Sequence, residues 1–348
     1  MSALVSITTK TDVERLHLHQ IHTLPVVVLY LHNQCNCRCV MCDIWRRREA
    51  TQLSVSDVER LLPSFRGFGV RWVVFSGGEP QLNEQWSWIA HLLRKLGCRI
   101  TLLTAGLLLK PQAKTVGHSV DDVIVSLDGP PPIHNAIRRI ADAYEHIAEG
   151  VEALRQIRPA MEVRARCTLQ KANHRSLRAT VEAAKCIGLT SVSFLAADVS
   201  STAFNRPDTW SPERQDRVAL TPAEIDALEL EIEQLIADEA ATGQQFVVEK
   251  PDKLRRIVKH FRAQIGLLPP SAPRCNAPWV SAVIEASGDV RPCFFQPAFG
   301  NIYRDDLSEI LNAPLALEFR SNLDISANEI CRRCVCSLHL STSETSDH

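Results

Sequence analysis

The chain has 348 residues, a length that predicts one to three domains. Its 39 basic and 40 acidic residues almost cancel, which argues against a general binder of nucleic-acid phosphates, because such binding needs a basic excess. Its twelve cysteines fall well below the roughly 8–10% of residues found in a small disulfide scaffold, so their positions must indicate their use.

The start of the chain contains no basic segment followed by an apolar one, so no secretory signal is predicted. The apolar stretch at 24–31 is far shorter than the roughly 20 residues that a membrane-spanning helix needs. We therefore expect a cytoplasmic protein without a membrane span. In a reducing cytoplasm, clustered cysteines indicate metal binding or catalysis rather than disulfides.

Six short runs rich in β-branched residues predict strands, at 26–32, 71–76, 99–104, 122–127, 162–169 and 190–195. Amphipathic stretches between them predict helices. Ser56 and Glu59 have the spacing of a capping box and predict the start of the first helix, and further helices are expected at 85–95, 141–156 and 175–187. Alternating strands and helices predict a parallel α/β sheet with right-handed crossovers, either open or closed into a barrel. In both cases the loops after the carboxyl ends of the strands hold the active site.

The pattern changes after the sixth predicted strand. Residues 198–212 are rich in Ser, Thr, Pro, Asn and Asp and predict a loop over the mouth of the active site. Thr221, Pro222 and Glu224 then predict the start of a helix that runs to about residue 240.

A proline-rich boundary at 267–273 separates this helical part from the end of the chain. Beyond it, strands are predicted at 279–285 and 290–295, joined by a hairpin turn at Ser287-Gly288-Asp289. The polar residues 341–348 predict a disordered tail.

Three cysteines near the front, Cys35, Cys39 and Cys42, have the spacing CxxxCxxC directly after the first predicted strand. Thiolates at these separations can hold one face of a [4Fe–4S] cluster and leave its fourth iron without a protein ligand. Such an iron is free to bind a small chelating molecule. With Cys37 the group could instead form a four-cysteine zinc site, but its spacing departs from the paired CxxC units typical of zinc, so we treat Cys37 as a bystander.

Three motifs resemble those of the radical S-adenosylmethionine (SAM) superfamily, in that family's order and each at the end of a predicted strand. The run CNCRCVMCDIW at 35–45 resembles the family's cluster loop, and SGGEP at 76–80 resembles its GGEP motif. SLDG at 126–129, followed by His134, Ile137 and Arg138, resembles its SLDG…H..IR segment. The resemblance covers about residues 24–200.

This resemblance implies a partial (β/α)6 TIM-like barrel with a [4Fe–4S] cluster at its mouth, held by Cys35, Cys39 and Cys42. SAM would chelate the open iron through its methionine amino and carboxylate groups. Reduction by a partner such as flavodoxin or ferredoxin would cleave SAM into methionine and a 5′-deoxyadenosyl radical, which takes hydrogen from a substrate. A closed barrel mouth would shield that radical from water.

The resemblance also implies which residues contact SAM. Gly77 and Gly78 would let the backbone approach the methionine ammonium, Glu79 would help to position it, and Pro80 would fix the turn. Ser126 and Asp128 would hydrogen-bond the ribose hydroxyls or, for the serine, the SAM carboxylate. Taken alone, both motifs are also compatible with plain turns between strand and loop.

The sequence departs from the family at three positions outside the cluster ligands. Met41 stands where an aromatic residue often packs on adenine, and its thioether can make a similar soft contact. Ala105 stands where asparagine is common, which removes one polar contact, and Arg139 replaces a common glycine.

Four cysteines in the last quarter, Cys275, Cys293, Cys331 and Cys334, resemble the pattern of the superfamily's SPASM and twitch domains. Four thiolates from a hairpin and a distant loop can saturate a second, auxiliary [4Fe–4S] cluster, for which electron transfer is the expected role. Zinc held by the same cysteines is the alternative. Only Cys336 follows them, so we expect one auxiliary cluster in a small α+β domain built from a β-hairpin and a helix.

We therefore predict five segments: an N-terminal extension at 1–23, a core barrel at 24–200, linker loop and helices at 201–266, a twitch- or SPASM-like domain at 267–340 and the tail at 341–348. The predicted function is hydrogen abstraction from a small polar metabolite, ending in oxidation or rearrangement. One alternative is a peptide-modifying maturase, for which the extension is too short to recognise a peptide. Another is a non-catalytic iron–sulfur or zinc protein that senses redox state. Arg166 and Asp198, near the fifth and sixth strands, are candidate substrate contacts.

Overall fold

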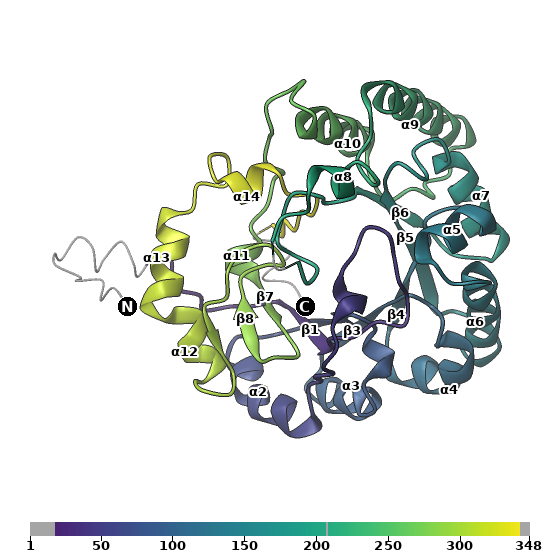
Figure 1. Cartoon of the computed structure of the whole chain (residues 1–348). Coiled ribbons are helices and arrows are strands. Elements are labelled where there is room, and N and C mark those ends of the chain that lie inside the picture. Colours follow the sequence, from purple (N-terminus) through teal and green to yellow (C-terminus); the bar gives the residue numbers. More distant parts are fainter. Residues whose placement is uncertain (1–17, 207, 342–348) are drawn as a thin grey trace.

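The computed structural model describes residues 18–206 and 208–341. Most of the predicted N-terminal extension and almost all of the predicted tail lie outside these residues. Within them, helices surround a curved sheet, and the C-terminal part of the chain continues the structure on one side of it (Figure 1).

Six parallel strands form the body of the sheet and agree with the six predicted strands to within two residues at either end: β1 (Val26–His32), β2 (Trp72–Gly77), β3 (Arg99–Thr104), β4 (Asp122–Ser126), β5 (Glu162–Leu169) and β6 (Val192–Ala196). They pair in chain order from β1 to β6. Apolar side chains such as Val27, Leu29 and Phe75 are fully buried under the helices. The sheet ends at β6, so the predicted partial barrel is confirmed.

Helices between the strands cover the outside of the barrel (Figure 1): α2 (Val55–Gly67), α3 (Trp86–Lys95), α4 (Leu109–Ser119), α5 (Pro131–Arg138), α6 (Ala143–Ile157) and α7 (Leu177–Cys186). Helices α4 and α5 were not predicted, because each carries proline. Pro111 lies in the first turn of α4 and Pro131 begins α5, where the missing N–H removes no helical hydrogen bond. Two short 3-10 turns follow strands, η1 (Ile44–Arg46) and η2 (Pro80–Leu82).

The later helices are α8 (Pro212–Gln215), α9 (Pro222–Thr242), α10 (Pro251–Gln264), α11 (Ala277–Val280), α12 (Leu307–Asn312), α13 (Pro314–Asn322) and α14 (Glu329–Arg332). Helix α9 begins as predicted, with Thr221 and Glu224 forming a capping box, and ends two residues later than predicted at Gly243, which has a left-handed backbone.

The predicted start of the first helix was wrong by two residues. Ser54, not Ser56, is the N-cap of α2: its hydroxyl accepts from the Asp57 N–H at 3.1 Å, and the Asp57 carboxylate accepts from the Ser54 N–H at 2.8 Å. The true capping box precedes the predicted one and uses Asp in place of Glu, so two overlapping pairs had nearly the same pattern.

The C-terminal hairpin joins the barrel sheet, which the sequence did not predict. Strand β7 (Ser281–Ile284) runs parallel to β1, and β8 (Asp289–Arg291) and β9 (Gly300–Asn301) follow it antiparallel. The turn at Gly288 is confirmed, with φ +86°. The strands are shorter than predicted, because Trp279 lies in α11 and the chain after Arg291 leaves the sheet. The five predicted segment boundaries stay predictions.

Candidate active site

The loop after β1 carries Cys35, Cys39 and Cys42, and all three thiols line one cavity of about 230 Å³ at the carboxyl ends of the barrel strands. The same cavity is lined by four of the predicted SAM contacts, Met41, Gly77, Gly78 and Ser126. The structure therefore brings the three predicted cluster ligands together with these four residues.

The two glycines at the end of β2 lie against the backbone that leads into the cluster loop. Gly77 has φ +127°, and a Cβ there would lie 2.4 Å from the His32 carbonyl oxygen. At Gly78 a Cβ would lie 2.0 Å from the Gln34 carbonyl oxygen. Any side chain at either position would push away the segment that precedes Cys35. This contact is a reason for glycine that the sequence analysis did not give.

Glu79 and Pro80 are not among the residues that line the cavity. Glu79 is fully buried, and its carboxylate accepts from the Thr104 hydroxyl at 2.9 Å and the Ala105 N–H at 2.8 Å. Burial raises the pKa of Glu79 to about 7. Glu79 thus joins the end of β2 to the end of β3, while Pro80 begins η2. A contact between Glu79 and the methionine ammonium stays a prediction.

Asp128 is also buried, and its carboxylate is held by the protein. One oxygen accepts from the Thr168 N–H at 2.9 Å, and the other forms an ion pair with Arg138 at 2.6 Å. Arg138 in turn donates to Cys39 Sγ at 3.4 Å. The structure therefore links Asp128 to the cluster loop through Arg138, and its predicted contact with ribose stays a prediction.

The electrostatics of the loop favour a thiolate at Cys39. A hydrogen bond from the Cys37 thiol and the charge of Arg138 lower the pKa of Cys39 to about 6, against the opposing effect of burial. The pKa of Cys37 itself is raised by its hydrogen bonds to Cys35 and Cys39. Cys37 thus lies beside two predicted cluster ligands, Cys35 and Cys39, and its protonated thiol donates hydrogen bonds to them. That Cys37 does not bind the cluster stays a prediction.

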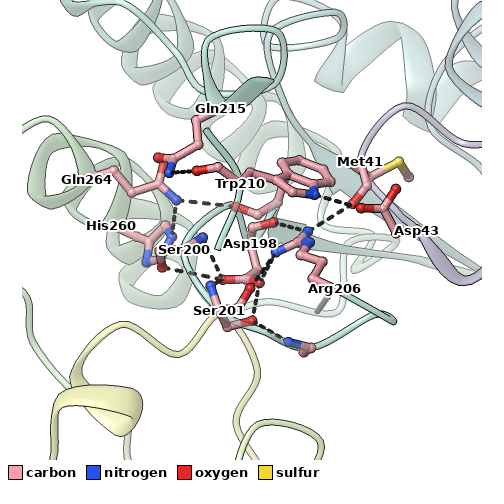
Figure 2. Close-up of polar contacts among 12 residues, drawn as sticks. Met41, Asp43, Asp198, Ser200, Ser201, Arg206, Trp210, Gln215, His260 and Gln264 are labelled. Atoms are coloured by element: carbon pink, nitrogen blue, oxygen red, sulfur yellow. Dashed lines mark hydrogen bonds and ion pairs between the residues drawn. The ribbon is translucent and has the colours of Figure 1, made fainter. Parts of the chain in front are cut away.

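The loop predicted at 198–212 contacts the cluster loop (Figure 2). Arg206 is buried and donates both to the Asp198 carboxylate, at 2.7 Å, and to the Met41 carbonyl, at 3.2 Å. Phe204 accepts from the Asp43 N–H at 3.2 Å through its carbonyl oxygen. The cluster loop is therefore fixed from a second side. Asp198 serves this contact and does not stand free for a substrate.

Trp210 anchors the same loop to Asp43, the residue after Cys42 (Figure 2). Its indole N–H donates to the Asp43 carboxylate at 2.7 Å, and the Arg206 guanidinium lies 3.9 Å from the centre of its ring. Arg214 also pairs with Asp43. Sequence reasoning missed these residues, because Trp210 and Asp43 lie 167 positions apart and no spacing pattern connects them.

A second cavity, of about 240 Å³, is lined by five thiols, those of Cys275, Cys293, Cys331, Cys334 and Cys336. Burial raises the pKa of Cys293 to about 11. The two cavities adjoin, because both are lined by Ser76, Leu103, Arg166, Phe294 and Cys336. In the described part of the chain, no group of three or more His, Cys, Asp or Glu side chains is placed to hold a single metal ion.

A third cavity, of about 590 Å³, lies at the mouth of the barrel between the cluster loop, the 198–212 loop and the C-terminal hairpin. It shares Gly77, Gly78 and Phe204 with the first cavity, and Glu285 and Arg291 of the hairpin region line it from the other side. The cavity at the mouth therefore adjoins the first cavity at the end of β2 and at Phe204.

Comparison with known proteins identifies two domains. Residues 29–182 match the radical SAM superfamily, and residues 275–335 match the SPASM iron–sulfur cluster-binding domain. The Fe-coproporphyrin III synthase of Methanosarcina barkeri is 29% identical over 161 residues, which are 44% of this chain and 39% of that protein. The AdoMet-dependent heme synthase of the same organism is 28% identical over 44% of this chain and 45% of its own. The chain thus matches less than half the length of these curated relatives.

Two solved structures share the fold. SuiB of Streptococcus suis, bound to the precursor peptide SuiA, superposes with a TM-score of 0.66 at 16% identity, over 96% of this chain and 78% of SuiB. The enzyme anSMEcpe with bound AdoMet gives a TM-score of 0.68 at 19% identity, over 89% of this chain and 86% of anSMEcpe. At these identities the similarity shows the fold alone.

The first prediction concerns iron content. After anaerobic reconstitution the wild-type chain should hold about eight irons, because two [4Fe–4S] clusters contain that number. Alanine in place of any one of Cys35, Cys39 or Cys42 should leave about four, and so should alanine at Cys275, Cys293, Cys331 or Cys334. Iron and sulfide assays measure the change. Cys37→Ala and Cys186→Ala are matched controls and should keep about eight; loss of four irons from Cys37→Ala would contradict the assignment.

The second prediction concerns pH. His134 is fully buried, its Nδ1 accepts from the Asp128 N–H at 3.1 Å, and burial lowers its pKa to about 3. Below pH 6.5 the unfolded chain binds a proton that folded His134 rejects, so this contribution to stability is complete above pH 6.5 and falls as the pH falls. From pH 7.5 to pH 5.5 the free energy of unfolding of the wild type should fall by about 1.4 kcal/mol more than that of His134→Gln. Urea unfolding at the two pH values measures the difference. Equal losses would show that His134 is protonated in the fold.

Proposed function

We propose, because this chain is a radical SAM protein with a C-terminal SPASM domain, that it cleaves SAM reductively and abstracts a hydrogen atom from a small polar substrate. The observation that carries the proposal is the single cavity lined by Cys35, Cys39 and Cys42. Three thiols around one cavity, with Cys37 outside its lining, match the donor set of a cluster that keeps one open iron.

The residues around this cavity fit the two cofactors. The three thiolates would hold the [4Fe–4S] cluster, and SAM would lie against Met41, Gly77, Gly78 and Ser126. When bound and reduced, the cluster supplies the electron that splits SAM into methionine and a 5′-deoxyadenosyl radical. The residues of this chain would position the two cofactors and shield the radical from water.

Positioning comes from side chains behind the cavity wall. Glu79 holds the end of β2 against β3, and Asp128 holds Arg138 against Cys39. Both carboxylates are fully buried, so they support the backbone around the cavity without lining it. In this proposal their direct contacts with SAM are secondary to this support.

Shielding comes from aromatic side chains at the mouth. Phe204 of the 198–212 loop packs edge-on against Phe295, with ring centres 6.0 Å apart, and Tyr30 of β1 packs against Phe294 at 5.7 Å. These pairs join the barrel and its loop to the segment after the hairpin. All four rings line the cavity at the mouth, and in this proposal they restrict the access of water to the inner cavity.

The second cavity suits an auxiliary cluster held by Cys275, Cys293, Cys331 and Cys334. Four thiolates saturate a cubane, which leaves electron transfer as its role. Support for that role comes from the shared wall of the two cavities, because it places the second set of thiols beside the substrate space. Cys336, on that wall, would remain a free thiol.

The proposed substrate is a small polar metabolite that lies where the two thiol cavities adjoin. The proposed electron donor is a flavodoxin or ferredoxin of the cytoplasm. Among residues 18–206 and 208–341, no helix has the length and apolar character needed to cross a membrane.

Peptide modification is the second candidate function. The cavity at the mouth, of about 590 Å³, favours it because a peptide could enter there and present one residue to the inner cavity. The related folds SuiB and anSMEcpe have been solved with peptides bound. A deuterium-labelled substrate of either class would decide between them, because the abstracted deuterium appears in 5′-deoxyadenosine.

The third prediction tests SAM cleavage. Wild-type protein incubated anaerobically with SAM and dithionite should release 5′-deoxyadenosine, measured by liquid chromatography and mass spectrometry. Cys35→Ala, Cys39→Ala and Cys42→Ala should each abolish the product, because the cluster loses a ligand. Cys186→Ala, at an exposed position outside both thiol cavities, should retain wild-type activity. Absence of the product from iron-replete wild-type protein would refute the proposed function.

A further inference from the structure

A further cavity, of about 210 Å³, lies against the cluster loop and is lined by Cys39; we call it the outer cavity. Its other walls come from η1, α5, the segment after β5 and the region of α8. Of the described residues, only Cys39 lines both the outer cavity and the cavity with the predicted SAM contacts. The outer cavity therefore reaches one predicted cluster ligand from a side that SAM would not occupy.

The outer cavity is basic. Its lining contains no acidic residue and four arginines, which are Arg46, Arg139, Arg214 and Arg217. Asp43, which is buried beside the cavity, pairs with Arg46 at 2.9 Å and with Arg214. Arg139 and Arg217 form no ion pair within residues 18–206 and 208–341. Because the whole chain is nearly neutral, this cluster of cations is a local feature of the surface around Cys39.

Arg139 holds a backbone conformation that residues with a side chain rarely adopt. It directly follows α5 and has φ +54° and ψ +42°. This left-handed conformation brings a Cβ too close to the backbone, which is why helices commonly end with glycine there. The family resemblance also has a common glycine at this position. A guanidinium at such a strained position suggests a use for its charge.

The outer cavity also has an aromatic wall. The Trp45 indole lines it, has the Arg46 guanidinium 4.8 Å from its ring centre, and donates to the Cys42 carbonyl at 2.9 Å. Indole and guanidinium planes both stack on aromatic rings. A hollow of this kind suits a redox partner that exposes the edge of a flavin ring. A ferredoxin, whose cluster lies beneath its own thiolates, offers no ring to such a wall.

We propose that the outer cavity is the docking site of the electron donor, and that this donor is a flavodoxin whose acidic surface meets the four arginines. The inference rests on the proposed function and assigns a partner to its cluster. The reduced flavin would give up one electron and the cluster held by Cys39 would accept it, so one group is oxidised as the other is reduced. Opposite charges on the two surfaces would steer the association.

The test uses reconstituted holoenzyme and a purified flavodoxin as the probe. Binding is measured at ionic strengths of about 0.05 M and about 0.5 M, because salt screens attraction between exposed charges. Wild-type protein should bind flavodoxin about 10-fold more weakly at the higher ionic strength. The rate of 5′-deoxyadenosine formation is then measured with reduced flavodoxin and, separately, with dithionite, which needs no protein docking site.

The test variant combines Arg139→Gly with Arg217→Gln. It removes the two guanidinium groups that have no ion pair among the described residues, and glycine relieves the left-handed backbone after α5, so the variant should fold. Flavodoxin binding and the flavodoxin-supported rate should each fall about 10-fold. The dithionite-supported rate and the iron content should stay at wild-type values. Arg66→Gln with Arg304→Gln, which removes two exposed arginines outside the outer cavity, is the matched control and should behave as wild type.

Each other outcome counts against the proposal. Failure of flavodoxin to bind the wild type, or equal binding to the test variant, overturns it. An equal loss in the control variant would show that only the net charge of the chain matters. Competition by millimolar inorganic phosphate at constant ionic strength would assign the arginines to a small anion instead. Binding is measured without SAM cleavage, so failure here is distinct from failure of the proposed function, which is read from 5′-deoxyadenosine formed with dithionite.

Discussion

The close contact between the end of β2 and the backbone before Cys35 is the constraint on which the site depends. The register of β1 against β2 shifts between Tyr30 and His32, and the chain beyond β1 then crosses Gly77 and Gly78 with no room for a side chain. This contact sets where the cluster loop begins. The positions of its three thiols depend on that starting point and on the contacts that hold the rest of the loop.

The opposite side of the loop is fixed by charge rather than by steric contact. Arg206 binds the Met41 carbonyl, and Trp210 and Arg214 bind Asp43. Arg206 and Trp210 lie outside regular secondary structure, so these contacts hold them in place, whereas Arg214 lies in the short helix α8. The same segment also lines the cavity at the mouth and, through Phe204, the inner cavity. Any substrate that enters by the mouth must pass this segment.

Local pattern was enough to predict the barrel but not the interior of the site. The six strands follow from β-branched runs, and the cysteine triad follows from its spacing. The pairing of β7 with β1 joins residues about 250 positions apart by backbone hydrogen bonds, which leave no mark on side-chain pattern. Burial of Glu79 and Asp128 was equally invisible, because a motif names a residue without showing which way it points.

The central claim is that Cys35, Cys39 and Cys42 hold a cluster whose fourth iron binds SAM. Electron–nuclear double resonance on the reduced wild-type protein, with SAM labelled by ¹⁵N at the methionine amino group and ¹³C at its carboxylate, measures this binding directly. The account predicts hyperfine couplings from both labels, because both groups chelate the open iron. A reduced cluster that shows neither coupling at saturating SAM would contradict it.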